Sequence, residues 1–353
     1  MRLLTLILAM MPITLTAQVL PADWSVPNTG ELICKALPGQ NSFPADMAFI
    51  DSIPELGLIV AAPINGQTVE SCYTELVLSG DWEWVEPNYI TEIDQCDMSG
   101  TGDDWQAADQ ASLGLDNCDA LPTAAWGQGI KVAVCDTGWE PHDEMPSSQQ
   151  LEGYNANSRL WESEGGDVTP QHPHGVQVTG CVRARVGGLP SSNGIRPLGI
   201  APGAETAIFD LSDSAGGSST LTAMAHAVAV AADNGFNIIT ISYSGGYSNA
   251  MRDAGTYAWN KGAILVMSAG NDNANRNIGD KDADNVVYVG ALNNTVSNTN
   301  ALQKASFSAY GNTVDIFSLG SQYPTANWNG GYTRVSGTSF SAPAVAGALA
   351  AIW

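Results

Sequence analysis

Short runs rich in β-branched residues, separated by segments of helical spacing, constrain the fold of this 353-residue chain most strongly. The runs are Lys131–Cys135 (KVAVC), Thr206–Leu211 (TAIFDL), Asn237–Tyr243 (NIITISY), Ala263–Ser268 (AILVMS) and Val286–Leu292 (VVYVGAL). They lack the apolar-polar alternation of strands with one solvated face. Between two of them, Ser218–Gly235 starts with hydroxyls, repeats apolar residues at helical spacing and ends at glycine. The pattern predicts an α/β fold, with a mostly parallel central sheet covered by helices on both faces.

A carboxylate stands directly after the first run, in Asp136-Thr137-Gly138. In such sheets functional side chains gather at the carboxyl ends of the strands, which makes Asp136 a candidate site residue. Asp after a strand also commonly caps a turn, so the tripeptide alone is ambiguous. Pepsin-like aspartic proteases use Asp-Thr-Gly too, but they need two carboxylates. With one such motif, this chain would have to supply the second by forming a dimer.

Two histidines flank a proline in Pro170–Ala184 (PQHPHGVQVTGCVRA), and His174 stands at the start of a predicted helix. His172 and His174 could form a metal-binding pair, but such sites need further ligands, and only His142 and His226 complete the set of histidines. No metal is therefore expected at this pair. The simpler alternative is a pair of surface histidines held rigid by the proline.

Two later segments offer a hydrogen-bond donor and a hydroxyl. Ile264–Asp272 (ILVMSAGND) indicates a strand that ends just before Asn271, whose side-chain amide can donate two hydrogen bonds. Val335–Pro343 (VSGTSFSAP) contains Ser339 among the small polar residues of a helix N-terminus, where hydroxyls are expected to cap the first turn. Each segment alone has a local structural explanation.

Together, Asp136, His174 and Ser339 supply the carboxylate, base and hydroxyl of nucleophilic catalysis. A serine hydroxyl is a weak nucleophile, so it requires a nearby base, a carboxylate to hold that base, and donors for the developing oxyanion. The blocks VAVCDTG, HGVQVTG and GTSFSAP that contain these residues resemble the subtilisin-like serine proteases (subtilases). The resemblance covers roughly residues 105–353.

The resemblance implies a secreted serine endopeptidase that works through an acyl-enzyme. Ser339 would attack the scissile carbonyl, His174 would take and return the proton, and Asp136 would orient the imidazole. Asn271 would join the Ser339 backbone amide in an oxyanion hole. Because a protonated imidazole cannot act as a base, activity is expected to fall in acid.

The resemblance also implies a substrate cleft. Extended peptide would pair as an added strand with Ser242, Tyr243, Ser244 and Gly245, and the pocket for the side chain before the cut would be walled by Ser268, Ala269 and Gly270. Asp272 follows the oxyanion asparagine, and charge complementarity suggests that this pocket accepts Lys or Arg. A solvated rim charge without effect is the alternative.

Upstream of the motifs, the chain has the organisation of an exported precursor. Residues 1–17 contain a basic start and an apolar run too short to span a bilayer well, as in a signal peptide. Trp84–Ile90 (WVEPNYI) resembles the end of a subtilase propeptide, which implies a small α+β inhibitor and folding domain at 18–94. The polar, acidic segment 95–111 indicates a linker with the processing site. The catalytic domain would then be 112–353, which is shorter at its C-terminus than subtilase domains commonly are.

The composition limits the kinds of molecule that the protein is expected to bind. The formal net charge of −23 opposes binding to nucleic acid or anionic lipid, so the expected partners are protein or peptide substrates and the chain's own propeptide. The 6 cysteines show no zinc spacing. Cys34 with Cys72 and Cys96 with Cys118 are the pairings that keep each disulfide within one segment, whereas Cys135 and Cys181 could equally be buried thiols.

The chemistry requires no cofactor. Structural calcium is compatible with so many carboxylates, but no ligands can be assigned. Two alternatives stay open at this point: an aspartic protease that uses Asp136 in a dimer, and a catalytically silent binding protein with the subtilase fold.

Overall fold

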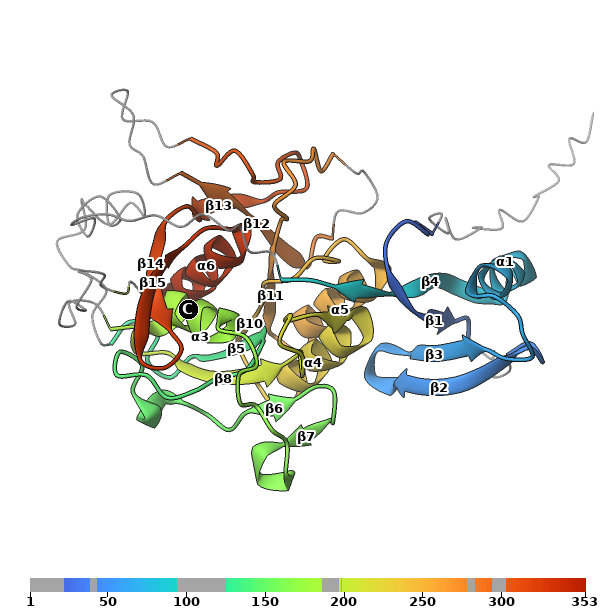
Figure 1. Cartoon of the computed structure of the whole chain (residues 1–353), viewed down its shortest axis with the longest axis horizontal. Coiled ribbons are helices and arrows are strands. Elements are labelled where there is room, and N and C mark those ends of the chain that lie inside the picture. Colours follow the sequence, from blue (N-terminus) through green and yellow to red (C-terminus); the bar gives the residue numbers. More distant parts are fainter. Residues whose placement is uncertain are drawn as a thin grey trace, which may run out of the picture.

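The computed structural model describes residues 22–38, 43–93, 125–185, 197, 199–277, 283–293 and 303–353. These residues form a larger body around an 8-stranded sheet and a smaller N-terminal body beside it (Figure 1). The expected signal segment 1–17 and linker 95–111, together with Cys96 and Cys118, lie outside the described residues.

The larger sheet has the strand order β13-β12-β11-β10-β5-β8-β6-β7. Its strands are β5 (Lys131–Asp136), β6 (Tyr154–Asn155), β7 (Leu160–Trp161), β8 (Glu205–Asp210), β10 (Ile238–Ile241), β11 (Ile264–Ser268), β12 (Val286–Leu292) and β13 (Ile316–Leu319). All neighbouring pairs are parallel except β6 with β7. The five sequence runs form β5, β8, β10, β11 and β12, so the predicted mostly parallel α/β sheet is confirmed.

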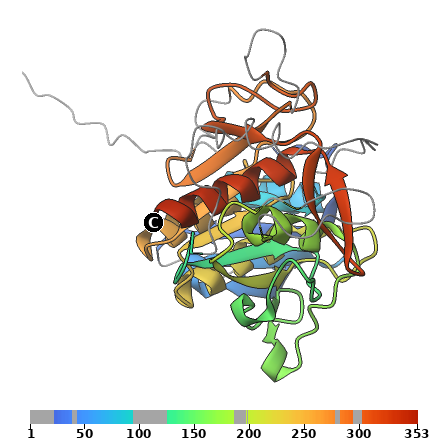
Figure 2. The same ribbon diagram turned by 90° about the vertical axis from the view of Figure 1, so that its left-hand side faces the viewer.

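Helices cover both faces of this sheet, as predicted. The α3 (His174–Arg183) and α6 (Thr338–Ile352) helices pack on one face, and α4 (Leu221–Asp233) and α5 (Asn249–Asn260) pack on the other. In Figure 2, α6 runs across its face of the sheet. Along β5, Val132 and Val134 belong to the core that contains α3 and α6, whereas Ala133 belongs to the core that contains α4 and α5. Because both faces are buried, the strands show no polar alternation.

Shorter elements complete this body. They are the β14 (Tyr323–Asn327) and β15 (Gly331–Val335) hairpin that leads into α6, the short strand β9 (Ser219–Thr220), and the 3-10 turns η2 (Ser147–Gln149) and η3 (Glu162–Glu164). At the start of α4, the Thr220 side chain accepts a hydrogen bond from the Ala223 amide at 3.2 Å, which is the hydroxyl cap that the sequence indicated. None of the described helices combines the length and apolar character needed to cross a bilayer.

The N-terminal body is a small α+β unit, also as predicted. It contains β1 (Asn28–Ala36), β2 (Met47–Ile53), η1 (Pro54–Leu56), β3 (Leu58–Pro63), α1 (Val69–Ser79) and β4 (Trp82–Thr91). The strands pair antiparallel in the order β2-β3-β1-β4, and β9 of the larger body adds to the β4 edge. Ile90 pairs with Thr220 and Thr91 with Ser219, so the sheet bridges the two bodies.

The expected disulfide within this unit is not formed. Cys34 and Cys72 are both buried in the core between the sheet and α1, and both are free thiols. They pack there as small apolar side chains, and burial raises the pKa of the Cys34 thiol. Cys135 and Cys181 are likewise buried free thiols.

Candidate active site

Asp136 and His174 meet at the carboxyl edge of the larger sheet. Asp136 is the last residue of β5, and His174 is the first residue of α3. His174 Nδ1 lies 2.7 Å from Asp136 Oδ1, and both side chains are 0% exposed. The Thr137 amide donates to the same carboxylate oxygen at 2.8 Å. A proton on Nδ1 that is donated to Asp136 leaves the lone pair of the imidazole on Nε2.

The Thr137 side chain holds the segments that carry Asp136 and His174 together, a role that the sequence motifs did not reveal. Its hydroxyl donates to the His172 carbonyl at 2.9 Å and accepts from the Gly175 amide at 2.9 Å. A Cβ on Gly175 would collide with the carbonyl oxygen of Gly138. Gly175 therefore allows the start of α3 to touch the backbone at the end of β5.

Ser339 is the second residue of α6 and is 0% exposed. Its hydroxyl donates to the Ser242 carbonyl at 3.3 Å, while the Ser242 hydroxyl donates to the Ser339 carbonyl at 2.8 Å. Within a helix, the Ser339 carbonyl would accept from the amide of residue 343, but Pro343 has none. The Ser242 hydroxyl satisfies this carbonyl instead and ties the serine to the end of β10.

Two buried polar atoms of the cluster have no hydrogen-bond partner among the described residues: His174 Nε2 and Asp136 Oδ2. Buried polar groups are normally satisfied, so an unpaired imidazole nitrogen needs an explanation. A base that exchanges a proton with a bound reactant provides one, because catalytic hydrogen bonds often form only in the complex with substrate.

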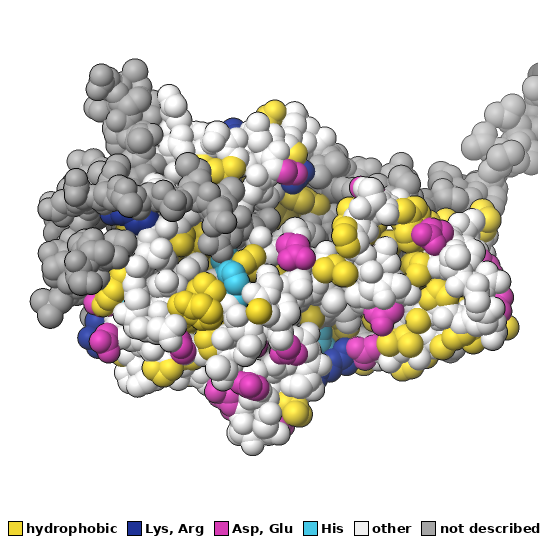
Figure 3. All heavy atoms as spheres, in the orientation of Figure 1, with side chains coloured by type: hydrophobic (Ala, Val, Ile, Leu, Met, Phe, Trp, Pro, Cys, Tyr) yellow, Lys and Arg dark blue, Asp and Glu magenta, His cyan; other side chains and the backbone are white. Residues whose placement is uncertain are grey.

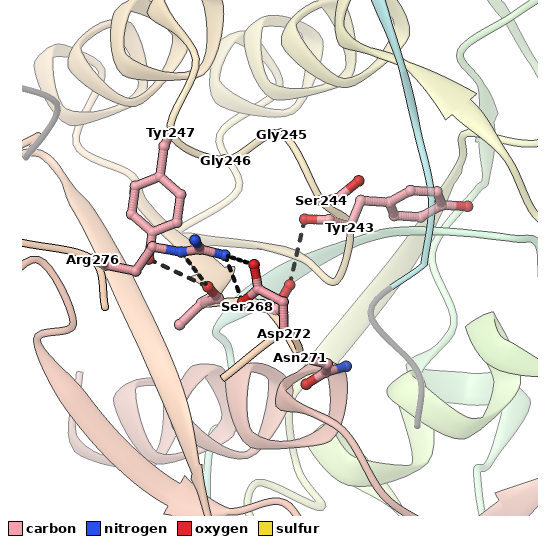
Figure 4. Close-up of a pocket in the computed structure, with 11 residues that line it drawn as sticks. Tyr243, Ser244, Gly245, Gly246, Tyr247, Ser268, Asn271, Asp272 and Arg276 are labelled. Atoms are coloured by element: carbon pink, nitrogen blue, oxygen red, sulfur yellow. Dashed lines mark hydrogen bonds and ion pairs between the residues drawn. The ribbon is translucent and has the colours of Figure 1, made fainter. Parts of the chain in front are cut away.

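The expected hydroxyl cap on α6 is absent. The N-cap residue is Gly337, with φ 151°, and it has no side chain that could cap the first turn. The backbone amide of Thr338 donates instead to Asn271 Oδ1 at 2.9 Å, and its hydroxyl donates to the same oxygen at 3.0 Å. These two bonds fix the plane of the Asn271 amide beside the start of α6 (Figure 4).

A cavity of about 300 Å³ opens beside Asn271. It is lined by Tyr243, Ser244, Gly245, Gly246, Tyr247, Ser268, Ala269, Gly270, Asn271, Asp272 and Arg276. Six of the seven expected substrate residues are among them, but Ser242 is not, because it is fully buried and its hydroxyl serves Ser339. Tyr247 and Arg276 were missed. Tyr247 follows closely after the expected segment 242–245. For Arg276, the only signal in the sequence was its position four residues after Asp272.

Asp272 is engaged by a cation of the chain itself. Arg276 Nη2 lies 2.9 and 2.8 Å from the two carboxylate oxygens, and the guanidinium carbon lies 5.3 Å from the centre of the Tyr247 ring. Burial, the largest single effect, raises the pKa of Asp272, but the hydrogen bonds from Arg276 and from the Ala274 amide, together with the charge of Arg276, hold the pKa below its usual value. The free carboxylate on which the expected Lys or Arg preference depended is therefore absent.

The chain's own N-terminal segment pairs with the expected peptide-binding strand. Ile93 forms an antiparallel bridge with Tyr243. The Ser244 amide donates to the Glu92 carbonyl at 2.8 Å, and the Glu92 amide donates to the Ser244 hydroxyl at 3.0 Å. An extended segment thus adds to this edge as a strand. Among the described residues, no three His, Cys, Asp or Glu side chains are grouped to hold a metal ion.

Comparisons with known proteins agree with this geometry. Residues 127–353 match the model of the subtilase family. Thermitase from Thermoactinomyces vulgaris is 34% identical over 231 residues, which cover 63% of this chain and 74% of thermitase. A thermophilic serine proteinase from Bacillus sp. (strain AK1) is 28% identical over 269 residues, or 76% of this chain and 62% of the relative.

Solved structures show the same fold. Fervidolysin from Fervidobacterium pennivorans, a keratinolytic enzyme related to subtilisin, matches with a TM-score of 0.66 and 22% identity. That match covers 92% of this chain and 54% of fervidolysin. The epidermin leader peptide processing serine protease of Staphylococcus aureus matches with a TM-score of 0.65 and 20% identity, over 91% of this chain and 87% of that protein.

Proposed function

Because the chain belongs to the subtilase family of serine-type endopeptidases, we propose that Asp136, His174 and Ser339 hydrolyse peptide bonds through an acyl-enzyme. Ser339 Oγ attacks the scissile carbonyl while His174 Nε2 accepts its proton and later returns it to the leaving amine. Asp136 holds the imidazole and stabilises its protonated form. The observation that carries the proposal is the buried contact between Asp136 and His174 Nδ1, which leaves Nε2 without a hydrogen-bond partner among the described residues.

The oxyanion hole in this proposal consists of Asn271 and the Ser339 backbone amide. The backbone amide and the hydroxyl of Thr338 both donate to Asn271 Oδ1, so the orientation of the Asn271 side-chain amide is set before substrate binds. Such preorganised donors stabilise the charge that develops in the transition state, and removing one typically costs about 100- to 1000-fold in kcat. The chemistry needs no cofactor.

We also propose that the protein is an exported zymogen. Residues 1–17 would be a signal peptide, 18–94 an intramolecular inhibitor, 95–111 the processing segment and 112–353 the catalytic domain. The Glu92 pairing with Ser244 supports inhibition, because a strand on this edge denies it to substrate. The continuous β4–β9 pairing supports a folding role, because it joins the two bodies through one sheet.

The aspartic protease alternative is disfavoured by the surroundings of Asp136. Its carboxylate is fully buried and bonded to His174, so a second copy of the chain cannot bring another carboxylate to it without unfolding the edge. A silent binding protein differs from an enzyme only in reactivity at Ser339, which is directly measurable.

Reaction of the purified, processed protein with a fluorophosphonate probe tests the proposal. Labelling is expected at Ser339, with loss of label and of peptide hydrolysis in Ser339→Ala. Ser341→Ala, two residues further along the same helix, is the control and should keep the label. If the processed protein takes up no probe, or if Ser339→Ala still does, the assignment of the nucleophile is wrong.

A further inference from the structure

The far end of the cavity beside Asn271 contains groups that the proposed chemistry does not use. There Arg276, Asp272 and Tyr247 lie together, with the guanidinium between the tyrosine ring and the carboxylate (Figure 4). The two walls of the cavity come from residues 243–247 and 268–272. Any side chain that enters between these walls meets this charged cluster.

Arg276 is fixed both through its backbone and through its side chain. Its amide donates to the Tyr310 carbonyl at 2.5 Å, and its own carbonyl accepts a hydrogen bond from the Thr313 hydroxyl. Nε donates to the Ala269 carbonyl at 3.4 Å, and Nη2 binds both oxygens of Asp272. A charged group held on so many sides is preorganised to meet a ligand.

The two members of the ion pair differ in exposure. The Arg276 side chain is 21% exposed and the Asp272 side chain is 56% exposed. Water therefore screens the carboxylate more than the guanidinium, and the inner charge is the positive one. Among the described residues, the Arg276 side chain makes its hydrogen bonds through Nε and Nη2 and makes none through Nη1. A guanidinium with unused donors is the group that proteins commonly use to bind a carboxylate.

Arg276 stands out against a strongly acidic protein. The sequence has 36 Asp and Glu residues against 13 Lys and Arg. On the face shown in Figure 3, acidic side chains are scattered widely and basic ones are few. A fixed arginine in a cavity next to the reacting residues is therefore not explained by the general charge of the surface.

We propose that Arg276 makes this cavity select an acidic side chain, glutamate or aspartate, at the substrate position before the cut. This proposal rests on the proposed function, since it needs the cavity to hold that side chain. The carboxylate of the substrate would accept hydrogen bonds from Arg276 Nη1, while Asp272 keeps the guanidinium in place. In the sequence, the residue after Ile93, which pairs with Tyr243, is the acidic Asp94, and it lies outside the described residues.

The test uses processed enzyme and four peptides that differ only at the position before the cut, which is Glu, Gln, Leu or Lys. High salt, where the screening length is about 3 Å at 1 M, removes the long-range repulsion between an acidic enzyme and an acidic peptide. We expect kcat/KM for Glu to exceed that for Leu and Lys by about tenfold or more, with Gln between. Fastest cleavage of the Leu or Lys peptide would overturn the proposal.

Two variants change the preference in opposite directions. Arg276→Met should abolish the advantage of Glu over Leu. Asp272→Asn should increase the ratio of Glu to Gln, because the guanidinium then keeps its charge without an internal counterion. The proposal is contradicted if the ratio of kcat/KM for the Glu and Leu peptides is unchanged in Arg276→Met. It is also contradicted if the ratio for the Glu and Gln peptides falls in Asp272→Asn. Failure of the proposed function is distinct, because the enzyme would then cleave none of the four peptides and take up no fluorophosphonate.

Discussion

At the scale of single residues, the site depends on side chains that are absent as much as on those present. Gly175 lacks the Cβ atom that would collide with the Gly138 carbonyl and separate α3 from the end of β5, and Pro343 lacks the amide that would bond to the Ser339 carbonyl. Thr137 and Ser242 supply hydroxyls that hold the resulting contacts together. These positions place the reacting groups without reacting themselves.

Gly175→Ala should therefore damage the site although it adds a single methyl group. The new Cβ would collide with the Gly138 carbonyl, and overpacking of this kind typically costs about 1–3 kcal/mol. We expect a lower free energy of unfolding in denaturant and slower labelling of Ser339 by fluorophosphonate. Gly216→Ala is the matched control, since a Cβ there meets no atom within 4 Å. Equal effects of the two substitutions would refute the close-contact explanation.

At the scale of elements, a side chain of β4 in the N-terminal body caps the N-terminus of α5 in the larger body. Glu86 lies in β4 and accepts hydrogen bonds from the Asn249 amide at 3.1 Å and the Ala250 amide at 2.8 Å, at the N-terminus of α5. A carboxylate suits a helix N-terminus. Burial between the two bodies nevertheless raises the pKa of Glu86 from 4.5 to about 7, and the two amide hydrogen bonds only partly oppose this.

The stability of the unprocessed chain should consequently depend on pH. A raised pKa means that the assembled state binds a proton more tightly than the unfolded state does. The stability from this group is complete below about pH 4.5 and is lost as the pH rises through about 7. The loss is on the order of 1 kcal/mol per pH unit between these limits.

Denaturant unfolding of the full chain carrying Ser339→Ala, from about pH 4 to about pH 8, measures this slope. Glu86→Gln in the same background keeps the size of the side chain and removes its titration, so its curve should be flatter. Parallel curves for the two proteins would show that Glu86 does not titrate in this range.

At the scale of the whole molecule, polar contacts join the two bodies at a distance from the cleft. Asp253 of α5 accepts from Lys35 Nζ at 2.6 Å and from Trp84 Nε1 at 3.1 Å, and both donors belong to the N-terminal body. Arg159 of the larger body pairs with Asp51 of β2. The inhibitor proposed above is therefore held by its side as well as by the strand in the cleft.

Asp253→Ala should release the N-terminal body faster. It leaves the Lys35 and Trp84 donors unpaired in a partly buried place, which typically costs about 1–3 kcal/mol. After processing, the appearance of activity towards a small peptide is expected to accelerate about tenfold. Asp233→Ala is the control, because Asp233 bonds to Lys261 and Tyr257 on the exposed surface of the larger body. The idea fails if both variants gain activity at the wild-type rate.

Much of the architecture could be predicted because it depends on local spacing. The five runs of β-branched residues became strands of one sheet, and His174 begins its helix, since burial on both faces and helix-start chemistry are written in neighbouring residues. The cap on α6 was mispredicted because the hydroxyls of that segment found long-range partners. Thr338 bonds to Asn271, 67 residues away, in place of its own helix.

The sequence by itself determined the fold class, the family and the candidates Asp136, His174 and Ser339, because the order and spacing of motifs are properties of the chain alone. Only the tertiary structure decided that the Ser242 side chain is buried and that Cys34 and Cys72 are free thiols. It also decided that Arg276 forms an ion pair with Asp272. These outcomes depend on which distant segments pack together, and sequence spacing does not specify those contacts. The charge that a substrate meets in the cavity is therefore a property of the folded molecule.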